Sequence, residues 1–362
     1  MNDNIKFITG NCLEILKTIS DNSVQCCVTS PPYFGLRDYG TAKWEGGDAE
    51  CKHYVSGDGE HGSTHAGEKQ QSNHGSMRVA KKTCPKCGAI RIDDQIGLEE
   101  SPEIYIAKLV DVFREVWRAL KDDGSLWLNL GDSYAGSNMT GGNNGINKSG
   151  GDKGFKMQRQ FKKGNNTYGF KPKDLIGIPW MVAFALRTNG WYLRSDIIWA
   201  KTNPMPESIK DRPTKSHEYI FLLAKSNKYF YDYQAVLEPA TGYDGRKDTK
   251  YKGGNKDMAG GAHERWQYKD GQPLRNQRDV WTINTKPYKE AHFATFPEEI
   301  PTRCIKAGSK IGDIVLDPFN GAGTTGLVCA KLGRKYIGID INENYIELSR
   351  KRIENVQISM LQ

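Results

Sequence analysis

Four consecutive residues, Ser30-Pro31-Pro32-Tyr33, have the types and spacing to activate a weak nitrogen nucleophile. Prolines stiffen the chain and lack an N–H donor, so the Pro31 carbonyl and the Ser30 side chain stay available as hydrogen-bond acceptors. Two such acceptors could hold the hydrogens of an exocyclic amine on a nucleic-acid base and favour its pyramidal, nucleophilic form. Tyr33 could stack on a base rotated out of a duplex, and Pro32 completes the loop. A rigid turn after a strand is the alternative interpretation.

A second segment, residues 317–325, could bind a cofactor. It reads as the end of a strand, a glycine-rich turn and the start of a helix, where free amides and close backbone approach favour a ligand. Its spacing matches neither the dinucleotide motif nor the phosphate-binding P-loop. Asp340 ends the next predicted strand, where its carboxylate could accept both hydroxyls of a ribose. We therefore expect an adenosyl cofactor; turn glycines that bind nothing are the alternative. The predicted contacts are Asp317, Phe319, Gly321, Gly323, Thr324, Thr325 and Asp340.

Cysteines in the segment 41–93 have the spacing of a structural metal site. Cys84 and Cys87 form a C-x-x-C-G turn, which presents two thiolates to one tetrahedral ion, and Cys51 and His53 are the natural second pair. His61, His65 and His74 compete for the histidine position. We expect a zinc knuckle that holds together a segment too polar to fold by burial. An exposed loop with reduced thiols is the alternative.

Strands that alternate with helices must position these groups. Ligands of such sheets bind where strands end, and both motifs directly follow predicted strands. The pattern predicts an α/β fold with a doubly wound, mostly parallel sheet. Expected strands are 4–9, 24–29, 125–131, 191–200, 217–224, 314–319 and 336–341, and expected helices are 11–19, 103–120, 175–189, 322–332 and 342–354.

Charge points to a polyanionic partner. The chain has 51 basic and 43 acidic residues, a net charge of +8. Residues 135–175 hold eight basic and two acidic residues, and residues 243–290 hold eleven and seven. Such segments can contact a nucleic-acid backbone, although solvated loops are the alternative. We see neither a membrane-length apolar run nor a signal peptide, and therefore expect a cytoplasmic protein.

The two motifs together resemble the signatures of the amino-group DNA methyltransferases, and their order, catalytic before cofactor, resembles the permuted β group. The segments 125–134, 191–204, 212–226 and 292–297 also resemble family motifs, and the likeness covers about two thirds of the chain. The resemblance implies the methyltransferase sheet, S-adenosyl-L-methionine as cofactor, double-stranded DNA as partner, and direct methyl transfer to nitrogen. We assign Asn11 and Phe293 to the cofactor site on the same basis.

The assignment of the target base depends on Ser30. Family members with Asp or Asn at this position mostly methylate adenine N6, and those with Ser mostly methylate cytosine N4, so Ser30 favours cytosine. Asn129 and Asp132 follow the neighbouring strand and could polarise the Ser30 hydroxyl. The chain has no Pro-Cys dipeptide, which disfavours methylation at cytosine C5. N6-adenine methylation is the alternative.

Other function classes remain open at this point. The chain could be a non-catalytic, zinc-containing DNA-binding protein that keeps the methyltransferase sheet, or it could methylate RNA or a protein glutamine. A cognate restriction endonuclease would be a separate polypeptide. We expect Arg265, Arg275 and Arg278 to read DNA bases. The predicted organisation is a catalytic half (1–40 and 94–239), a zinc-knuckle insertion (41–93), a basic loop (135–173), a target recognition region (240–290) and a cofactor-binding half (291–362).

Overall fold

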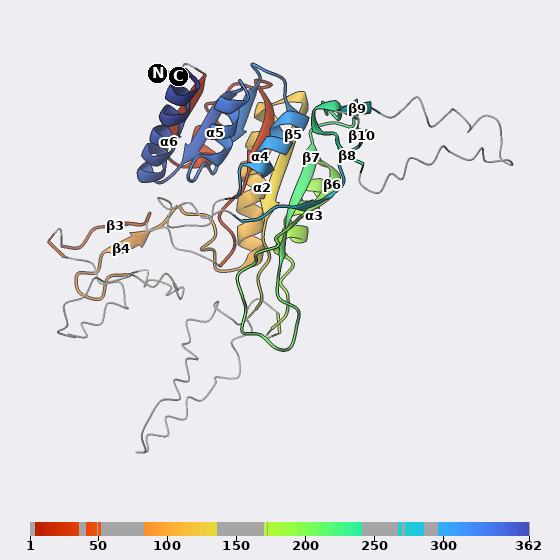
Figure 1. Ribbon diagram of the computed structural model, residues 1–362. Helices are drawn as coiled ribbons and strands as arrows, with labels where there is room; N and C mark the ends of the chain where they lie inside the picture. The colour runs from red at the N-terminus through yellow and green to blue at the C-terminus, as the bar shows by residue number, and fades with distance from the viewer. Residues whose placement is uncertain are drawn as a thin grey trace, which may run out of the picture.

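A computed structural model describes residues 4–35, 41–48, 50–51, 83–135, 170–171, 173–240, 267–269, 272–285 and 296–361. Its centre is an eight-stranded sheet in which β7 runs antiparallel to both of its neighbours (Figure 1). All the remaining neighbouring strands are parallel to each other. The predicted doubly wound, mostly parallel fold is confirmed. The strand order is β1 (Ile5–Thr9), β13 (Lys335–Asp340), β12 (Ile314–Asp317), β2 (Val24–Thr29), β5 (Leu120–Leu130), β7 (His217–Ala224), β6 (Tyr192–Ala200) and β11 (Val280–Thr282).

Alternate side chains of the central strands enter two separate cores, one on each face of the sheet. In β5, Leu126 and Leu128 belong to one core and Trp127 to the other. Helices α1 (Cys12–Leu16), α2 (Pro102–Ala119) and α3 (Ile178–Thr188) cover the first face. Helices α4 (Glu299–Gly308) and α5 (Thr324–Lys331) cover the second, and α6 (Glu343–Leu361) packs against α5. Because both faces of the sheet are covered, every residue of β2 is buried.

Helix α2 begins and ends where its sequence predicts. Ser101 caps its N-terminus, with the Ser101 hydroxyl accepting from the Ile104 N–H, and Pro102 occupies the first turn. The helix stops at Ala119 and β5 begins at once at Leu120, so the Lys-Asp-Asp-Gly sequence that we expected to separate them lies within the strand. None of the helices in the described part of the chain is both long and apolar enough to cross a membrane.

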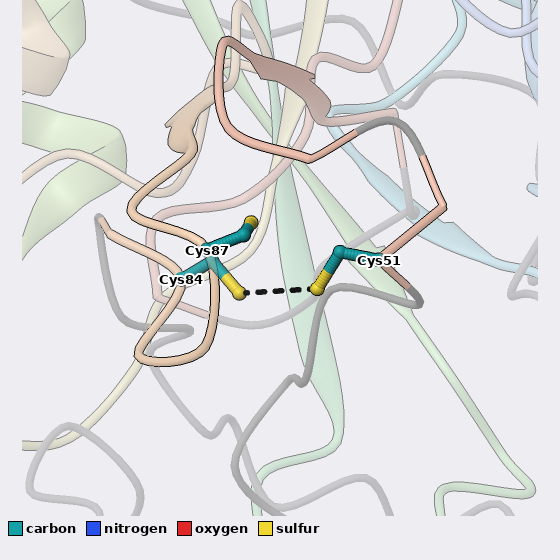
Figure 2. Close-up of side chains that lie close together, drawn as sticks. All are labelled: Cys51, Cys84 and Cys87. Atoms are coloured by element: carbon teal, nitrogen blue, oxygen red, sulfur yellow. Dashed lines mark hydrogen bonds between the residues drawn. The ribbon is translucent and has the colours of Figure 1, made fainter.

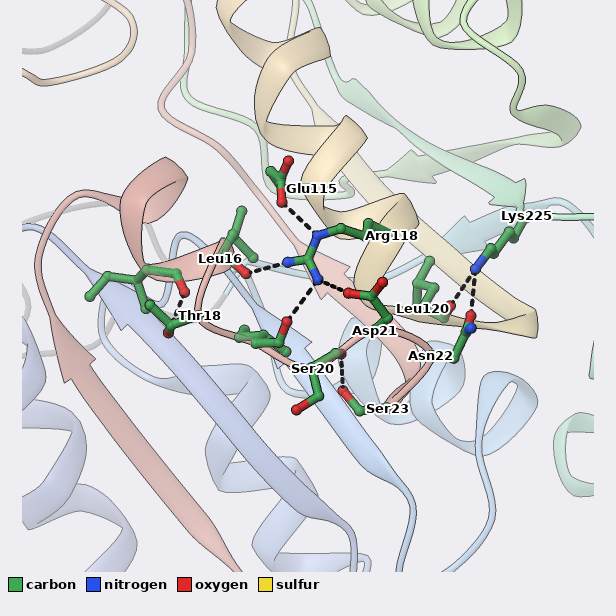
Figure 3. Close-up of polar contacts among 12 residues, drawn as sticks. Leu16, Thr18, Ser20, Asp21, Asn22, Ser23, Glu115, Arg118, Leu120 and Lys225 are labelled. Atoms are coloured by element: carbon green, nitrogen blue, oxygen red, sulfur yellow. Dashed lines mark hydrogen bonds and ion pairs between the residues drawn. The ribbon is translucent and has the colours of Figure 1, made fainter.

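Arg118, at the end of α2, fixes the loop between α1 and β2 (Figure 3). Its guanidinium donates to the carbonyls of Leu16 and Ile19 at 2.7 and 2.9 Å and pairs with Asp21 and Glu115. Nearby, Lys225 donates to the Leu120 carbonyl and to the Asn22 Oδ1 in the loop between α1 and β2, as Figure 3 also shows. These contacts brace the end of the sheet where β2 and β5 begin, which leaves the opposite ends free for function.

Two small sheets lie outside the central one. Strands β3 (Lys43–Glu45) and β4 (Ile90–Ile92) form an antiparallel pair that projects beyond the end of the large sheet (Figure 1). The other is formed by strands β8 (Glu238–Pro239), β9 (Gln267–Lys269) and β10 (Gln272–Arg275). It lies at the opposite edge of the molecule from β3 and β4 in Figure 1. The next strand, β11, joins the large sheet beside β6, with Trp281 in the core. The end of the predicted recognition region is therefore part of the central sheet.

Candidate functional site

The carboxyl ends of the parallel strands meet around one cavity of about 990 Å³. Ser30 to Tyr33 reach it from the end of β2, Asn129 from β5, and Asp340 from β13. The turn after β12 and Asn11 after β1 complete the wall on the other side. The two motifs predicted to carry the chemistry, nearly 300 residues apart in sequence, thus share a single cavity.

The loop after β2 is fixed by close contacts to its backbone and to one ring. The Tyr105 hydroxyl donates to the Pro32 carbonyl at 2.9 Å. A side chain at Gly131 would begin 2.5 Å from the Tyr33 ring, so only glycine lets this ring lie where it does. Within the described part of the chain, the Pro31 carbonyl accepts no hydrogen bond and Pro31 lines the cavity. This carbonyl is therefore free to accept from a ligand.

A chain of hydroxyl groups leads away from Ser30. The Ser30 Oγ lies 3.4 Å from the Tyr33 hydroxyl, which donates to Glu218 Oε2 at 2.6 Å. Asn129 Nδ2 also donates to Glu218, and Lys201 pairs with the second carboxylate oxygen. Burial and the Glu218 charge raise the pKa of Tyr33 well above its usual value, which keeps the phenol protonated as a donor. The Ser30 hydroxyl can then donate to Tyr33 and keep its lone pairs for a ligand.

This network corrects the predicted partners of Ser30. Neither Asn129 nor Asp132 bonds to the Ser30 hydroxyl in the described structure; Asn129 acts one step away, through Tyr33 and Glu218. The Asp132 carboxylate accepts from the backbone N–H groups of Gly177 and Ile178, at 3.0 and 3.1 Å. Its oxygens are occupied in capping the N-terminus of α3, where a negative charge is favourable.

The glycine-rich turn is held open toward the cavity by Asp340. The Gly321 N–H donates to Asp340 Oδ2 at 2.7 Å, and the Asn342 N–H donates to Oδ1 at 2.9 Å. Gly321 has a φ of +50°, and a Cβ there would meet nothing closer than 4.0 Å. Burial raises the pKa of Asp340. Among the predicted cofactor residues, this edge of the cavity is lined by Asn11, Phe319, Gly321, Thr324 and Asp340.

Three other predicted cofactor residues lie behind the turn and do not line the cavity: Asp317, Gly323 and Thr325. Asp317 is 1% exposed and accepts from the Thr29 hydroxyl at 2.6 Å and the Phe319 N–H at 3.1 Å. Burial raises the Asp317 pKa to about 6, against the hydrogen bonds from Thr29 and Thr325. A Cβ at Gly323 would begin 2.5 Å from Ser349 Oγ in α6. These residues shape the turn from behind, and that all seven touch the cofactor stays a prediction.

Several cavity residues were not singled out from the sequence. Glu218 and Lys201 are joined in an ion pair, and the Lys201 ammonium lies 4.3 Å from the centre of the Trp199 ring. All three line the cavity. The segments 191–204 and 212–226, which resemble family motifs, contain them. The signal was therefore present, but only the folded chain shows that β6 and β7 bring these side chains to Tyr33.

The thiols of Cys51, Cys84 and Cys87 converge beside the β3–β4 pair (Figure 2). All three sulfurs lie within 4.8 Å of one another, and those of Cys51 and Cys84 are 3.9 Å apart. Ligands about 2.3 Å from a tetrahedral zinc ion are separated by about 3.8 Å, so the cluster fits this metal. The Cys84 N–H donates to the Ala89 carbonyl, which closes the turn between the two cysteines. His53, the predicted fourth ligand, is outside the described residues.

The cysteine turn is connected to the cavity by the chain that follows β4. Residues 93–96 line the cavity wall opposite the glycine-rich turn. The Gly35 N–H, just after the Ser30–Tyr33 loop, donates to the Gly97 carbonyl at 2.9 Å. This hydrogen bond joins the segment that follows β4 to the end of that loop.

Two of the arginines predicted to read DNA lie outside the cavity. Arg275 and Arg278 both pair with Glu238, at 3.0 and 2.7 Å, and neither lines the cavity. The Arg275 side chain is only 25% exposed, so its ion pair serves the small β8–β10 sheet, whereas Arg278 is 62% exposed. Arg265 and the cofactor candidate Phe293 are outside the described residues.

Comparisons with known proteins agree with this geometry. A family model described as DNA methylase, covering the N6 and N4 methyltransferases, matches residues 24–351. The chain is 40% identical to the type II methyltransferase M.Cfr9I of Citrobacter freundii over 97% of this chain and 88% of that protein. It is 41% identical to M.SmaI of Serratia marcescens over 96% and 90%. The solved PvuII DNA methyltransferase, titled cytosine-N4-specific, superposes with a TM-score of 0.56 at 16% identity, over 97% of this chain and 86% of that one.

Proposed function

Because the chain belongs to the N6/N4 DNA methylase family, we propose that it transfers a methyl group from S-adenosyl-L-methionine to the N4 amine of cytosine in double-stranded DNA. The observation that carries this proposal is the single cavity shared by the Ser30–Tyr33 loop and the glycine-rich turn. A volume of about 990 Å³ can accommodate a nucleoside-sized cofactor together with one base.

The cofactor would lie along the turn that follows β12. Gly321 leaves open space where a side chain would stand, and Asp340 can accept ribose hydroxyls with the lone pairs that its two backbone donors leave free. Phe319 and Asn11 line the same part of the cavity. When bound, the cofactor supplies a methyl group on a positively charged sulfur, which a nitrogen can attack without metal or covalent assistance from the protein.

The protein's part is to hold the amine. The Pro31 carbonyl and the Ser30 hydroxyl each accept one amino hydrogen, which favours the pyramidal form of the nitrogen and directs its lone pair toward the methyl group. Glu218 positions Ser30 through Tyr33: because Tyr33 donates to the carboxylate, its oxygen is free to accept from Ser30. Glu218 is thus a positioning residue, which acts on the amine through Tyr33 and Ser30.

The choice of cytosine rests on Ser30. A hydroxyl that donates to Tyr33 can accept an amino hydrogen, whereas family members that methylate adenine N6 mostly have Asp or Asn at this position. N6-adenine methylation is the second candidate, since either base presents an exocyclic amine. A non-catalytic DNA-binding protein is disfavoured, because the loop, the turn and Asp340 form one continuous cavity.

The test is transfer of a radiolabelled methyl group from S-adenosyl-L-methionine to duplex DNA. The wild-type protein should label the DNA, and Ser30→Ala should lower kcat by about 100-fold while cofactor affinity stays nearly unchanged, because the lost contact serves the transition state. Label in RNA or in protein but not in DNA would refute the proposal.

We also propose that Cys51, Cys84 and Cys87 hold a structural zinc ion, with His53 as the fourth ligand. The mutual approach of the three sulfurs supports this. A polar segment that cannot bury apolar surface would gain its order from the metal. We further propose that the segments 41–93 and 135–173 and the exposed Arg278 contact the duplex, and that a cognate restriction endonuclease, if the cell has one, is a separate chain.

A further inference from the structure

The connection between β6 and β7 presents a large apolar side chain to solvent at the mouth of the cavity. Met205 is 78% exposed and lines the cavity. It stands between Pro204 and Pro206, in a connection that Figure 1 shows extending beyond the end of the large sheet. A single exposed apolar side chain is common on protein surfaces, but at the rim of the cavity Met205 is placed to contact a ligand that enters it.

The connection that carries Met205 is braced on both sides. Asn203 and Thr285 exchange two hydrogen bonds, of 3.2 and 3.0 Å, between side chain and backbone. Beyond Met205, Arg212 pairs with Glu207 at 2.7 Å, and its guanidinium lies 3.8 Å from the centre of the Tyr134 ring. The prolines on either side of Met205 restrict the backbone further. The backbone on both sides of Met205 is therefore held in place, and the Met205 side chain extends from it into solvent.

A DNA duplex from which one base has been extruded offers apolar surface that could cover the exposed Met205 side chain. The base that enters the cavity leaves a gap whose upper and lower walls are the apolar faces of neighbouring base pairs. Proteins that deform DNA insert apolar side chains, methionine among them, between base steps. Met205 lies at the rim of the cavity that would receive the base, so it would stand at the opening through which the base leaves the duplex.

We infer that Met205 inserts into the DNA stack beside the target base and fills the space that this base vacates. This inference rests on the proposed function, because it requires that the substrate is duplex DNA. The side chain stabilises the extruded state without touching the reacting amine. Its contribution should accordingly depend on how strongly the target base is held in the duplex.

The experiment measures single-turnover methylation of two DNA duplexes. Both carry the target sequence mapped by sequencing DNA that the wild-type protein has modified. In the first duplex the target base is paired, and in the second the nucleotide opposite it lacks its base. Met205→Ala should slow methylation of the paired duplex on the order of tenfold or more, since unstacking and unpairing oppose extrusion. On the second duplex it should approach the wild-type rate, and Met205→Leu should behave like wild type on both.

Ile209→Ala is the matched control. Ile209 lies on the same connection and is 40% exposed, but it does not line the cavity, so its loss should leave both rates unchanged. Equal slowing of both duplexes by Met205→Ala, or no slowing of either, would overturn the inference. A wild-type protein that methylates no DNA would instead refute the proposed function itself, so the two failures are distinct.

Discussion

Three side chains set the direction of the Ser30 hydroxyl. Tyr33 accepts from Ser30 because its own proton is directed to Glu218, and Lys201 balances the charge of that carboxylate. The sequence alone pointed to Asn129 and Asp132, because both follow the neighbouring strand. It could not show that α3 begins beside Asp132 and uses its carboxylate as a cap. Nor could it show that the antiparallel strand β7 delivers Glu218 to the phenol.

Glu218→Gln tests this chain of hydrogen bonds. The amide can still contact Tyr33 but has no charge to orient the phenol, so we expect kcat to fall by roughly 10- to 100-fold. Cofactor affinity and KM for DNA should change little, because Glu218 is bonded to Tyr33, Asn129 and Lys201 and not to the cofactor turn. Asp132→Asn, which alters only the α3 cap, should leave kcat near the wild-type value. Equal kcat losses in both variants would show that Glu218 has only a structural effect.

Asp317 gives a prediction on pH and stability. Its pKa is about 6 in the folded protein against 3.8 for an ordinary carboxyl. Ionisation of Asp317 therefore opposes folding. The contribution of this carboxyl to the stability of the folded protein is greatest below pH 3.8 and is lost as the pH rises through 6. Asp317→Asn, which can still accept from Thr29, does not titrate. Its unfolding free energy relative to wild type should rise by about 2 kcal/mol between about pH 4 and pH 7. Urea unfolding that shows a constant difference across this range would contradict the assignment.

Among the elements, those with a regular apolar pattern were predicted, whereas β11, α4 and the strands of the two small sheets were not. The apolar stripe of α2 and the buried runs of β2 and β7 lie within a few residues of their expected bounds. Strand β11 has three residues within a basic, polar stretch, and it becomes a strand only because β6 offers a free edge. The helix α4 was missed as well; its sequence mixes proline and charged residues with the apolar side chains that reach the core.

We propose that the order of the β3–β4 pair depends on the metal bound by the three cysteines. Protein purified without added metal should contain about one equivalent of zinc, and Cys84→Ser/Cys87→Ser should lose it and become sensitive to protease within 41–93. Because this segment continues into the cavity wall, methylation should weaken in the same variant. Cys329→Ala, in the core far from the cluster, should keep its zinc. Elemental analysis that finds no zinc in fresh, reduced wild-type protein would end the proposal.

At the scale of the whole molecule, the cavity joins two distant parts of the chain. The sheet places β2 next to β12, so the loop after one and the turn after the other face each other. Motif spacing and strand alternation predicted this arrangement, since ligands of such sheets bind at strand ends. The cavity rim could not be predicted in the same way. Met205 lies outside the segments that resemble family motifs, and its position depends on how β6 and β7 pair.

The most direct measurement is the identity of the methylated nucleoside. Duplex DNA is incubated with the wild-type protein and S-adenosyl-L-methionine carrying a deuterated methyl group, digested to nucleosides, and analysed by mass spectrometry. We expect deuterated N4-methyldeoxycytidine, strongly reduced with Ser30→Ala. N6-methyldeoxyadenosine as the sole product would contradict the assignment of cytosine from Ser30, and 5-methyldeoxycytidine or no labelled nucleoside would contradict amine methylation altogether.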